Sequence, residues 1–175
     1  MSVKAGWQGR FFEDFEPGDV YEHPLGRTIT ETDNIWFTLL TMNTAELHFN
    51  VEVGKASEFG RSLVASTLTL AIAAGQSVID TSQNAMANLG WEEIKLTVPV
   101  FAGDTLWSES VVLSKRESAS RAYAGIVSIK TRTINQHGDE VLSFRRSFFV
   151  YKRGAAERPQ GRRPTPKVPL VGVDA

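Results

Sequence analysis

A long run without charge, Leu63 to Ile79, constrains the fold of this chain more than any other part of its sequence. It reads LVASTLTLAIAAGQSVI, and Arg61 and Asp80 stand close to its two ends. Its length approaches that of a membrane-spanning helix, which needs about 20 apolar residues. It is rich in Ser, Thr, Ala and Gly rather than in Leu and Phe, which favours a helix buried inside a globular domain. We therefore expect a helix from about Ser62 to Ile79 that is apolar on every side.

The composition excludes several classes of protein and of site. The chain has 175 residues and a formal net charge of -1, so we expect one globular domain with no nucleic-acid or membrane partner. It has no cysteine, which excludes disulfides, thiol nucleophiles and cysteine-bound metal sites. That absence fits a cytoplasmic location. Residues 1–19 also lack the apolar core of a signal peptide.

Shorter elements are expected before the apolar run. Apolar residues over Asp33–Met42 recur at helical spacing, and Thr30 or Thr32 precedes them as a candidate N-cap. The stretch Asn43–Asn50 is rich in Asn and Thr, which favour bonds from side chain to backbone over continuation of a helix. A further helical turn is expected over Val51–Glu58.

The composition changes to that of strands after the apolar run. Val, Ile, Phe, Thr and Ser become frequent, and turn signals such as Gly103-Asp104 separate the stretches that hold them. Four strands are expected, at Trp91–Val100, Leu106–Lys115, Tyr123–Asn135 and Val141–Lys152.

This order of elements predicts the fold class. A helix that is apolar all round needs cover on every side, and an antiparallel sheet wrapped around it supplies that cover, so the class is α+β. Joining two such sheets edge to edge would protect their open edges, which predicts a homodimer or a higher homo-oligomer. We expect one domain over residues 1–153. The segment 154–175 is rich in Pro, Gly and Arg and is expected to be a solvated tail, or one that contacts a partner subunit or a phosphate.

The chain has three histidines, and each is a candidate functional residue. His23 precedes Pro24, and His137 lies in a Gln-His-Gly-Asp turn, so both are expected to be exposed loop residues. His48 lies in a loop just past the first short helix and precedes the apolar helix by a short connection, and loops held by rigid elements often carry catalytic groups. An incidental structural role for His48 remains open on spacing alone. No spacing typical of a metal site surrounds it, and no phosphate-binding or dinucleotide-binding motif is present.

Three segments in order resemble the MaoC-like acyl dehydratases, which include the R-specific enoyl-CoA hydratases. NTAELHFN, at 43–50, resembles the family's D-x-N-P-hydrophobic-H-x-D loop. FGRSLV, at 59–64, resembles its F-G-R-P-I-V entry into the central helix, and PVFAGDTL, at 99–106, matches its P-V-F-x-G-D-T turn. The resemblance covers roughly Phe12 to Lys152. The stretches FTLLTMNTAELHFN, STLTLAIAAGQSV and SQNAMANLGWEEIKL look most like the branch with mesaconyl-CoA and itaconyl-CoA hydratases.

The resemblance implies a hot-dog fold, an antiparallel sheet wrapped around a long central helix, and a reaction. Family members add water to a trans-2-enoyl-CoA to give an R-3-hydroxyacyl-CoA, or catalyse the reverse. An acidic residue and a histidine hold the water, and a backbone N–H at the start of the central helix bonds the thioester oxygen. A helix N-terminus suits this task, because its free N–H groups and dipole favour negative charge. No metal or cofactor is implied beyond the coenzyme A of the substrate.

The family's catalytic positions carry over to three residues of this chain. His48 takes the histidine position, Asn43 the acidic position, and the backbone N–H of Ser66 the oxyanion position. Further residues lie where the acyl thioester would pass. These expected substrate-binding residues are Phe59, Gly60, Arg61, Ser62 and Ala65.

The chain departs from the family pattern at Asn43, because an asparagine orients water but cannot accept a proton as a base. His48 would then act as the main acid and base, a role that suits a side chain titrating near neutral pH. Glu46 stands at the usual proline position and brings a carboxylate into the same segment. Arg61 is a candidate for binding a second carboxylate of the acyl group, or for a surface salt bridge.

Two other functions remain open on the sequence. The asparagine at position 43 is compatible with a hot-dog protein that binds acyl-CoA, or a partner subunit, with little catalysis. A thioesterase on the same fold would need a carboxylate aimed at the thioester carbon, and Glu46 or Glu58 is a nearby candidate. Fold alone does not decide among these functions.

Overall fold

The computed structural model describes residue 4, residues 6–161 and residues 164–167 of the chain. In chain order its elements are the 3₁₀ turn η1 (Phe12–Asp14), β1 (Val20–Glu22), β2 (Arg27–Thr28), α1 (Glu31–Leu40), the 3₁₀ turn η2 (Glu46–His48), α2 (Val51–Ala56), α3 (Ser66–Ser77), the π-helical turn η3 (Val78–Ser82), β3 (Ala85–Leu96), β4 (Thr105–Glu117), β5 (Ala124–Ile134) and β6 (Glu140–Tyr151).

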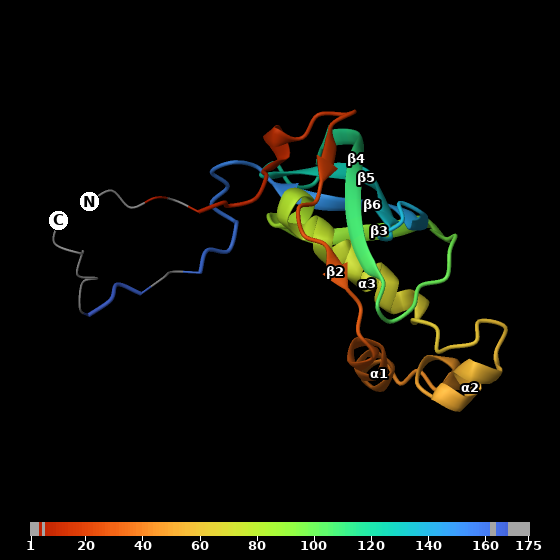
Figure 1. The fold of residues 1–175 in the computed structure, drawn as a ribbon. Coiled ribbons are helices and arrows are strands. Elements are labelled where there is room, and N and C mark those ends of the chain that lie inside the picture. The colour runs from red at the N-terminus through yellow and green to blue at the C-terminus, as the bar shows by residue number, and fades with distance from the viewer. Residues whose placement is uncertain (1–3, 5, 162–163, 168–175) are drawn as a thin grey trace, which may run out of the picture.

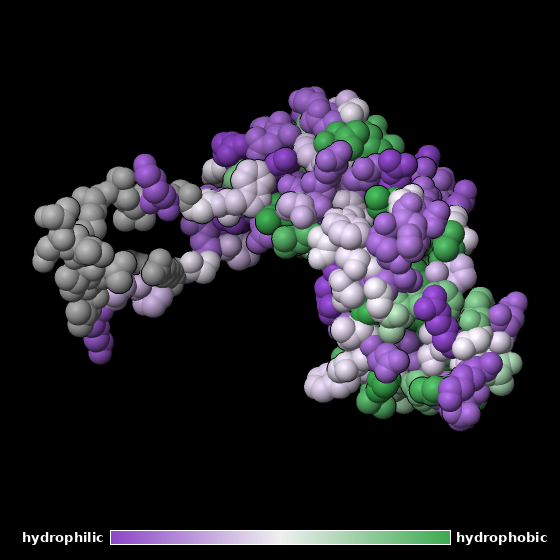
Figure 2. All heavy atoms as spheres, in the orientation of Figure 1, coloured by the Kyte–Doolittle hydropathy of each residue, from purple (hydrophilic) through white to green (hydrophobic). Residues whose placement is uncertain are grey.

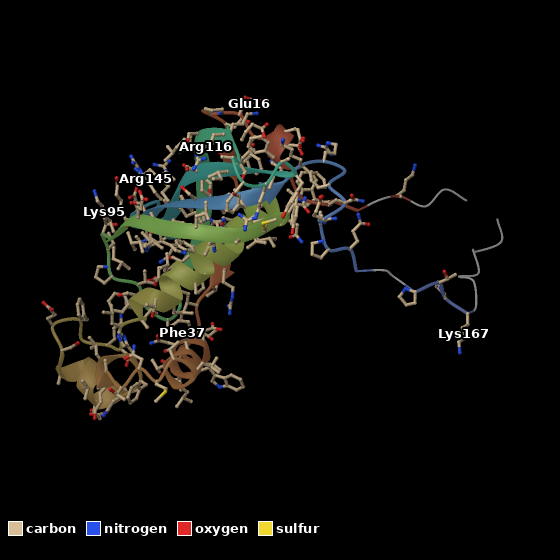
Figure 3. The ribbon with its side chains drawn as sticks, turned by 180° about the vertical axis from the view of Figure 1, so that it is seen from behind. Glu16, Phe37, Lys95, Arg116, Arg145 and Lys167 are labelled. Carbon is tan, nitrogen blue, oxygen red and sulfur yellow. The ribbon has the colours of Figure 1, made fainter. Side chains whose placement is uncertain are left out.

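The strands form one antiparallel sheet with α3 packed across one face (Figure 1). The strand order is β1-β4-β5-β6-β3, and β2 pairs with β4 beside β1. Figure 3 shows Lys95, Arg116 and Arg145 projecting from the opposite face of the sheet. The expected α+β class, with an antiparallel sheet over a central helix, is therefore confirmed.

The central helix α3 has one buried side and one exposed side. Leu68, Thr69, Ala73 and Ser77 are buried against the sheet. Ser66, Thr67, Ala71 and Gly75, on the other side of the helix, are exposed. We expected this helix to be covered on every side, but within the chain the sheet covers one side only. No helix in the described part of the chain is both long and apolar enough to cross a membrane.

The expected bounds of the apolar helix, Ser62 to Ile79, are wrong at its beginning. Residues before Ser66 are extended: the N–H of Leu63 donates to Leu47 O at 3.2 Å, and that of Val64 to Val100 O at 2.9 Å. Leu63 also forms an isolated β-bridge with Phe101. These long-range hydrogen bonds hold the approach to α3 out of the helical conformation, which a pattern of apolar residues does not reveal.

The expected strand Trp91–Val100 is shifted, because β3 spans Ala85–Leu96. The sequence Asn88-Leu89-Gly90 reads as a break, yet the strand continues through it with irregular register against β6. Glycine inside a strand often marks such a bulge. The other three expected strands are confirmed to within a few residues as β4, β5 and β6.

The helices α1 and α2 lie together beyond the N-terminal end of α3 (Figure 1). Thr30, rather than Thr32, is the N-cap of α1: its hydroxyl accepts from the N–H of Asp33, whose carboxylate accepts from the N–H of Thr30 in return. This reciprocal capping box starts the helix two residues earlier than the expected Asp33.

His23 lies in a loop, as expected, but the expectation that it is exposed is wrong, because its side chain is buried. Its Nδ1 lies 2.9 Å from Asp80 Oδ2, and its Nε2 lies 2.9 Å from Ser110 Oγ. Asp80 belongs to the π-helical turn η3, which turns this carboxylate toward β1. A histidine before a proline reads as loop, and the partner that buries it is 57 residues away.

Part of the expected tail contacts the domain. Arg158 Nε donates to Asn84 Oδ1 at 2.9 Å. The division at residue 153 stays a prediction, and residues 162–163 and 168–175 of the tail lie outside the described residues.

The buried His23 predicts a pH dependence of stability. Burial lowers the pKa of His23 below its ordinary value of 6.5, and the positive charge of Arg146 lowers it further. The hydrogen bond to Asp80 and the negative charge of Glu109 oppose this shift but do not reverse it. Below pH 6.5 the unfolded chain binds a proton that the folded chain resists, so the unfolding free energy should fall as the pH falls through this region.

Urea denaturation at a series of pH values measures this effect. A His23→Gln variant should lose part of the pH dependence between neutral pH and the lowered pKa, whereas the exposed His137→Gln variant should retain it. An unchanged slope in His23→Gln would show that another group causes the acid destabilisation.

Candidate active site

Asparagine side chains hold the segment between α1 and α2 in place. The side-chain oxygen of Asn43 accepts from the N–H of Ala45 at 3.0 Å, and the backbone N–H of Asn43 donates to Thr38 O at 2.9 Å. Asn50 caps α2, since its Oδ1 accepts from the N–H of Glu52 at 3.1 Å. The expected bonds from side chain to backbone are therefore present, and they shape the turn η2 that carries His48.

The ring of His48 is fixed by a backbone carbonyl. Its Nδ1 lies 2.8 Å from Leu63 O. A carbonyl oxygen only accepts, so Nδ1 must carry the proton in this hydrogen bond. In the neutral ring the lone pair is then on Nε2, which has no hydrogen-bond partner among the described residues. In its neutral form, the half-buried His48 thus has a nitrogen that can accept a proton.

His48 lines a pocket of about 210 Å³ beside α1 and α2. Its walls combine apolar residues with one carboxylate and two cations. The lining residues are Glu31, Asn34, Ile35, His48, Phe49, Val51, Lys55, Gly60, Arg61, Ser62 and Ala102. A larger groove of about 590 Å³ flanks the other end of α3, but no histidine or carboxylate is among its lining residues. The smaller pocket is therefore the better candidate for acid–base chemistry.

The pocket brings together some of the residues expected from the sequence. His48, Gly60, Arg61 and Ser62 line it, whereas Asn43 is not among its lining residues.

The other expected residues lie close by in the chain. Phe59 packs edge-on against Phe101, with ring centroids 6.2 Å apart. Ala65 is buried as the N-cap of α3, and Ser66 is the first residue of that helix. The catalytic and binding roles of all these residues stay predictions.

The first turn of α3 offers free backbone donors. Ala65 provides no side-chain cap, and within the described residues neither the N–H of Ser66 nor that of Thr67 donates to an acceptor. The N–H of Ala65 is already taken, by Asn34 Oδ1 at 2.9 Å. Ser66 therefore carries the first free donor of the helix, where the dipole also favours negative charge.

Arg61 lies with its guanidinium carbon 3.7 Å from the centroid of the Phe101 ring. Within the described residues it forms no ion pair, so the surface salt bridge that the sequence left open is not found. Stacking on an aromatic ring leaves the edges of a guanidinium free for a planar anion.

Sequence analysis missed three polar or charged residues of this pocket: Glu31, Asn34 and Lys55. Glu31 stands in the first turn of α1, where an acidic residue is explained by the helix dipole alone. Asn34 lies one turn later, in a helix that was predicted from the spacing of its apolar residues. Glu31 is the only carboxylate among the described residues that line the pocket.

The described residues hold no group of three or more His, Cys, Asp or Glu side chains that could bind a metal ion. The chemistry that the pocket itself offers is acid–base chemistry at His48 and Glu31, and the free donors of α3 begin at Ser66, outside its lining residues.

Comparison with known proteins identifies relatives of this chain. A family model described as mesaconyl-CoA hydratase matches residues 3–169. The mesaconyl-CoA hydratase of Cereibacter sphaeroides is 35% identical over 161 residues, which are 92% of this chain and 46% of that protein. The beta-methylmalyl-CoA dehydratase of Chloroflexus aurantiacus is 34% identical over 153 residues, 87% of this chain and 43% of that protein. The chain spans about half the length of these relatives.

Solved structures agree with this relationship. A MaoC domain protein dehydratase from Chloroflexus aurantiacus superposes with a TM-score of 0.82 and 31% identity over 95% of this chain and 47% of that chain. A Mycobacterium tuberculosis protein with a double hot-dog fold superposes with a TM-score of 0.76 and 22% identity over 93% of this chain and 53% of that chain, which supports the fold alone. The hot-dog fold implied by the resemblance is confirmed, and the chain belongs to the mesaconyl-CoA hydratase family.

Proposed function

We propose that this chain catalyses the reversible addition of water to a 2-enoyl-CoA thioester, giving an R-3-hydroxyacyl-CoA. One observation carries the proposal: Nδ1 of His48 donates its proton to Leu63 O at 2.8 Å, which leaves the lone pair of the neutral ring on Nε2. His48 also lines a pocket whose wall includes Ser62, a few residues before α3 begins. Relatives named mesaconyl-CoA hydratase and beta-methylmalyl-CoA dehydratase support the same chemistry in both directions.

The proposed reaction uses His48 as base and then as acid. Nε2 takes a proton from water as the water oxygen bonds to the β-carbon, and the electron pair of the double bond moves through the α-carbon onto the thioester oxygen. The N–H of Ser66 donates to that oxygen as its charge develops. The enolate then collapses, and the proton on Nε2 passes to the α-carbon. The atoms of one water are thereby added and no electron is lost or gained.

Asn43 and Glu31 are the proposed water-orienting groups. Asn43 is not among the pocket's lining residues and its Oδ1 already accepts from the N–H of Ala45, so in this proposal it orients the water through its amide N–H groups; it cannot take the proton. Glu31 supplies a carboxylate to the pocket that His48 lines. We propose that Glu31 fulfils part of the role that an acidic residue at position 43 has in the resembling family.

The proposed reaction needs no metal or cofactor beyond the coenzyme A of the substrate, because each step is a proton transfer or a hydrogen bond. A cytoplasmic location is part of the proposal, since acyl-CoA thioesters are intracellular metabolites and the chain contains no cysteine.

The proposed acyl group is short and carries a second carboxylate, as mesaconyl-CoA does. Two cations in the pocket support this choice, Arg61 and Lys55. Arg61 is the stronger candidate, because its guanidinium is held on the Phe101 ring with free edges, while Lys55 Nζ already pairs with Glu52 at 2.8 Å. A fixed guanidinium suits a bidentate carboxylate.

We propose that two copies of the chain form a dimer through β3. This strand is at the edge of the sheet and exposes Leu89, Ile94 and Leu96. An apolar strand edge of this kind is a ready partner for another strand. The end of the molecule formed by α1 and α2 is also rich in apolar surface (Figure 2). Relatives about twice as long as this chain support a unit of two hot-dog domains.

Removing the imidazole should abolish most of the hydration activity. With crotonyl-CoA or mesaconyl-CoA as substrate, His48→Ala should lower kcat by about 10²- to 10⁴-fold, the usual value of a placed acid–base group. Loss of the enoyl absorbance measures hydration, and Asn43→Ala tested in parallel measures the contribution of the orienting amide.

The same assay separates the rival functions when released thiol is followed as well. Hydration without thiol supports the proposal. Thiol release supports a thioesterase, and tight binding with neither product supports an acyl-CoA-binding protein. Full hydration by His48→Ala would show that the site has been assigned wrongly.

If Glu31 shares in proton transfer, Glu31→Gln should lower kcat by about 10²-fold, at the low end of the range for acid–base groups. The matched control is Glu52→Gln on α2, whose carboxylate is exposed and is not among the pocket's lining residues. Equal kcat values for the wild type and Glu31→Gln would exclude Glu31 from the reaction.

Replacing Arg61 should change the choice of substrate. Arg61→Met should raise KM for mesaconyl-CoA by about tenfold or more, because a hydrogen bond to a charged group contributes about 1.5–3 kcal/mol. The KM for crotonyl-CoA, which lacks the second carboxylate, should change little. Lys55→Met is the matched variant: a larger effect on mesaconyl-CoA from Lys55→Met than from Arg61→Met would contradict the assignment.

A further inference from the structure

Asn34 is a buried amide on α1 that makes three hydrogen bonds to the backbone around the pocket. Its side chain is 4% exposed. Its Nδ2 donates to His48 O at 2.7 Å and to Leu63 O at 3.0 Å. Its Oδ1 accepts from the N–H of Ala65 at 2.9 Å. Both donor hydrogens and the acceptor oxygen of this one side chain are therefore in use.

These three partners belong to two segments of the site whose relative position the proposed reaction depends on. The carbonyl of His48 belongs to the turn η2, while Leu63 and Ala65 lead into α3. The same Leu63 carbonyl accepts from the ring of His48. Asn34 thus holds the backbone of the catalytic histidine, the acceptor of its ring, and the residue just before the free N–H of Ser66.

Apolar contact contributes little to holding α1 in place, because Phe37 alone among its large apolar residues packs, half-buried, against the core. The fully buried residues of the helix are the polar Asn34 and Thr38. Its large apolar residues Trp36, Leu39 and Leu40 are exposed. A helix that uses its buried face for an amide and a hydroxyl gains little from the hydrophobic effect there, so the position of α1 depends strongly on what Asn34 bonds.

We propose that Asn34 is a positioning residue for the hydration reaction, a proposal that rests on the function proposed above. It holds Leu63 O where that oxygen accepts from Nδ1 of His48, which keeps the ring in the tautomer with a bare Nε2. It also occupies the N–H of Ala65, so that the N–H of Ser66 is the first donor left for the thioester oxygen. One amide thereby fixes the base and the oxyanion donor relative to each other.

The experiment measures both catalysis and the state of the ring. The variants are Asn34→Ala, which removes all three hydrogen bonds, and Asn34→Asp, whose carboxylate still accepts from the N–H of Ala65 but no longer donates to the two carbonyls. Thr38→Val is the matched control, because Thr38 is equally buried on the same helix and its hydroxyl bonds only Ile35 O, within the helix. Nitrogen-15 NMR of the histidine rings, with His48 assigned by comparison with His48→Ala, reports which ring nitrogen carries the proton.

Both Asn34 variants should lower kcat by about 10²-fold, the loss expected from a misplacement of about 1 Å, with KM much less affected. Their His48 signals should lose the fixed Nδ1-protonated pattern, while Thr38→Val keeps the wild-type pattern and kcat. Asn34→Asp decides the matter if Asn34→Ala does not fold. A variant at Asn34 that folds and keeps the wild-type ring signals would overturn the proposal, as would an equal loss of kcat in Thr38→Val.

The ring signals also separate this proposal from the proposed function. A wild-type protein that hydrates no enoyl-CoA contradicts the function, whereas the tautomer of His48 in the Asn34 variants still decides whether Asn34 positions the ring.

Discussion

The carbonyl oxygen of Leu63 is the point on which the candidate site depends. It accepts from Nδ1 of His48 at 2.8 Å and from Nδ2 of Asn34 at 3.0 Å. The N–H of the same residue donates to Leu47 O, and the residue forms a β-bridge with Phe101. Leu63 therefore ties α1, the turn η2 and the approach to α3 to one position. Loss of a buried partner of this kind costs about 1–3 kcal/mol, more than the roughly 0–1 kcal/mol of an exposed ion pair such as Lys55–Glu52.

The two ends of α3 use histidine in different ways. At the C-terminal end, both ring nitrogens of His23 are occupied, by Asp80 and by Ser110. This order of carboxylate, imidazole and hydroxyl resembles that of a serine nucleophile site, but Ser110 is 1% exposed and is also bonded to Thr131. A buried and fully bonded hydroxyl meets no substrate, so this cluster is structural. At the N-terminal end, His48 keeps one nitrogen free beside a pocket, and only that arrangement can exchange a proton with a ligand.

The features that were predicted correctly from the sequence depend on residues that lie close together in the chain. The positions of β4, β5 and β6 follow from their composition, and the short helix with its threonine cap follows from spacing. His48 was predicted from its place in a segment with a recognisable motif, and it lines the pocket. What the sequence did not predict depends on contacts across the chain. Leu63 and Val64 fit a helical pattern, but hydrogen bonds to Leu47 and Val100 keep them extended.

The residues missed in the site share the same cause. Glu31 at the start of a helix and Asn34 within it have ordinary local explanations, and nothing nearby in the sequence marks them as part of a pocket. Asn34 acts on residues 14 and 29 positions away. The burial of His23 was missed because Pro24 indicates only a loop, and the partner that buries the ring, Asp80, lies far along the chain.

The central claim is that Nε2 of His48 and the N–H of Ser66 act on the same thioester. A crystal structure with a bound R-3-hydroxyacyl-CoA tests it most directly. We predict the 3-hydroxyl oxygen within about 2.6–3.2 Å of Nε2, the reach of a general base, and the thioester oxygen hydrogen-bonded to the N–H of Ser66. An acyl group seated instead in the groove beside Gln76 and Val78, with Nε2 facing no atom of the ligand, would contradict the account.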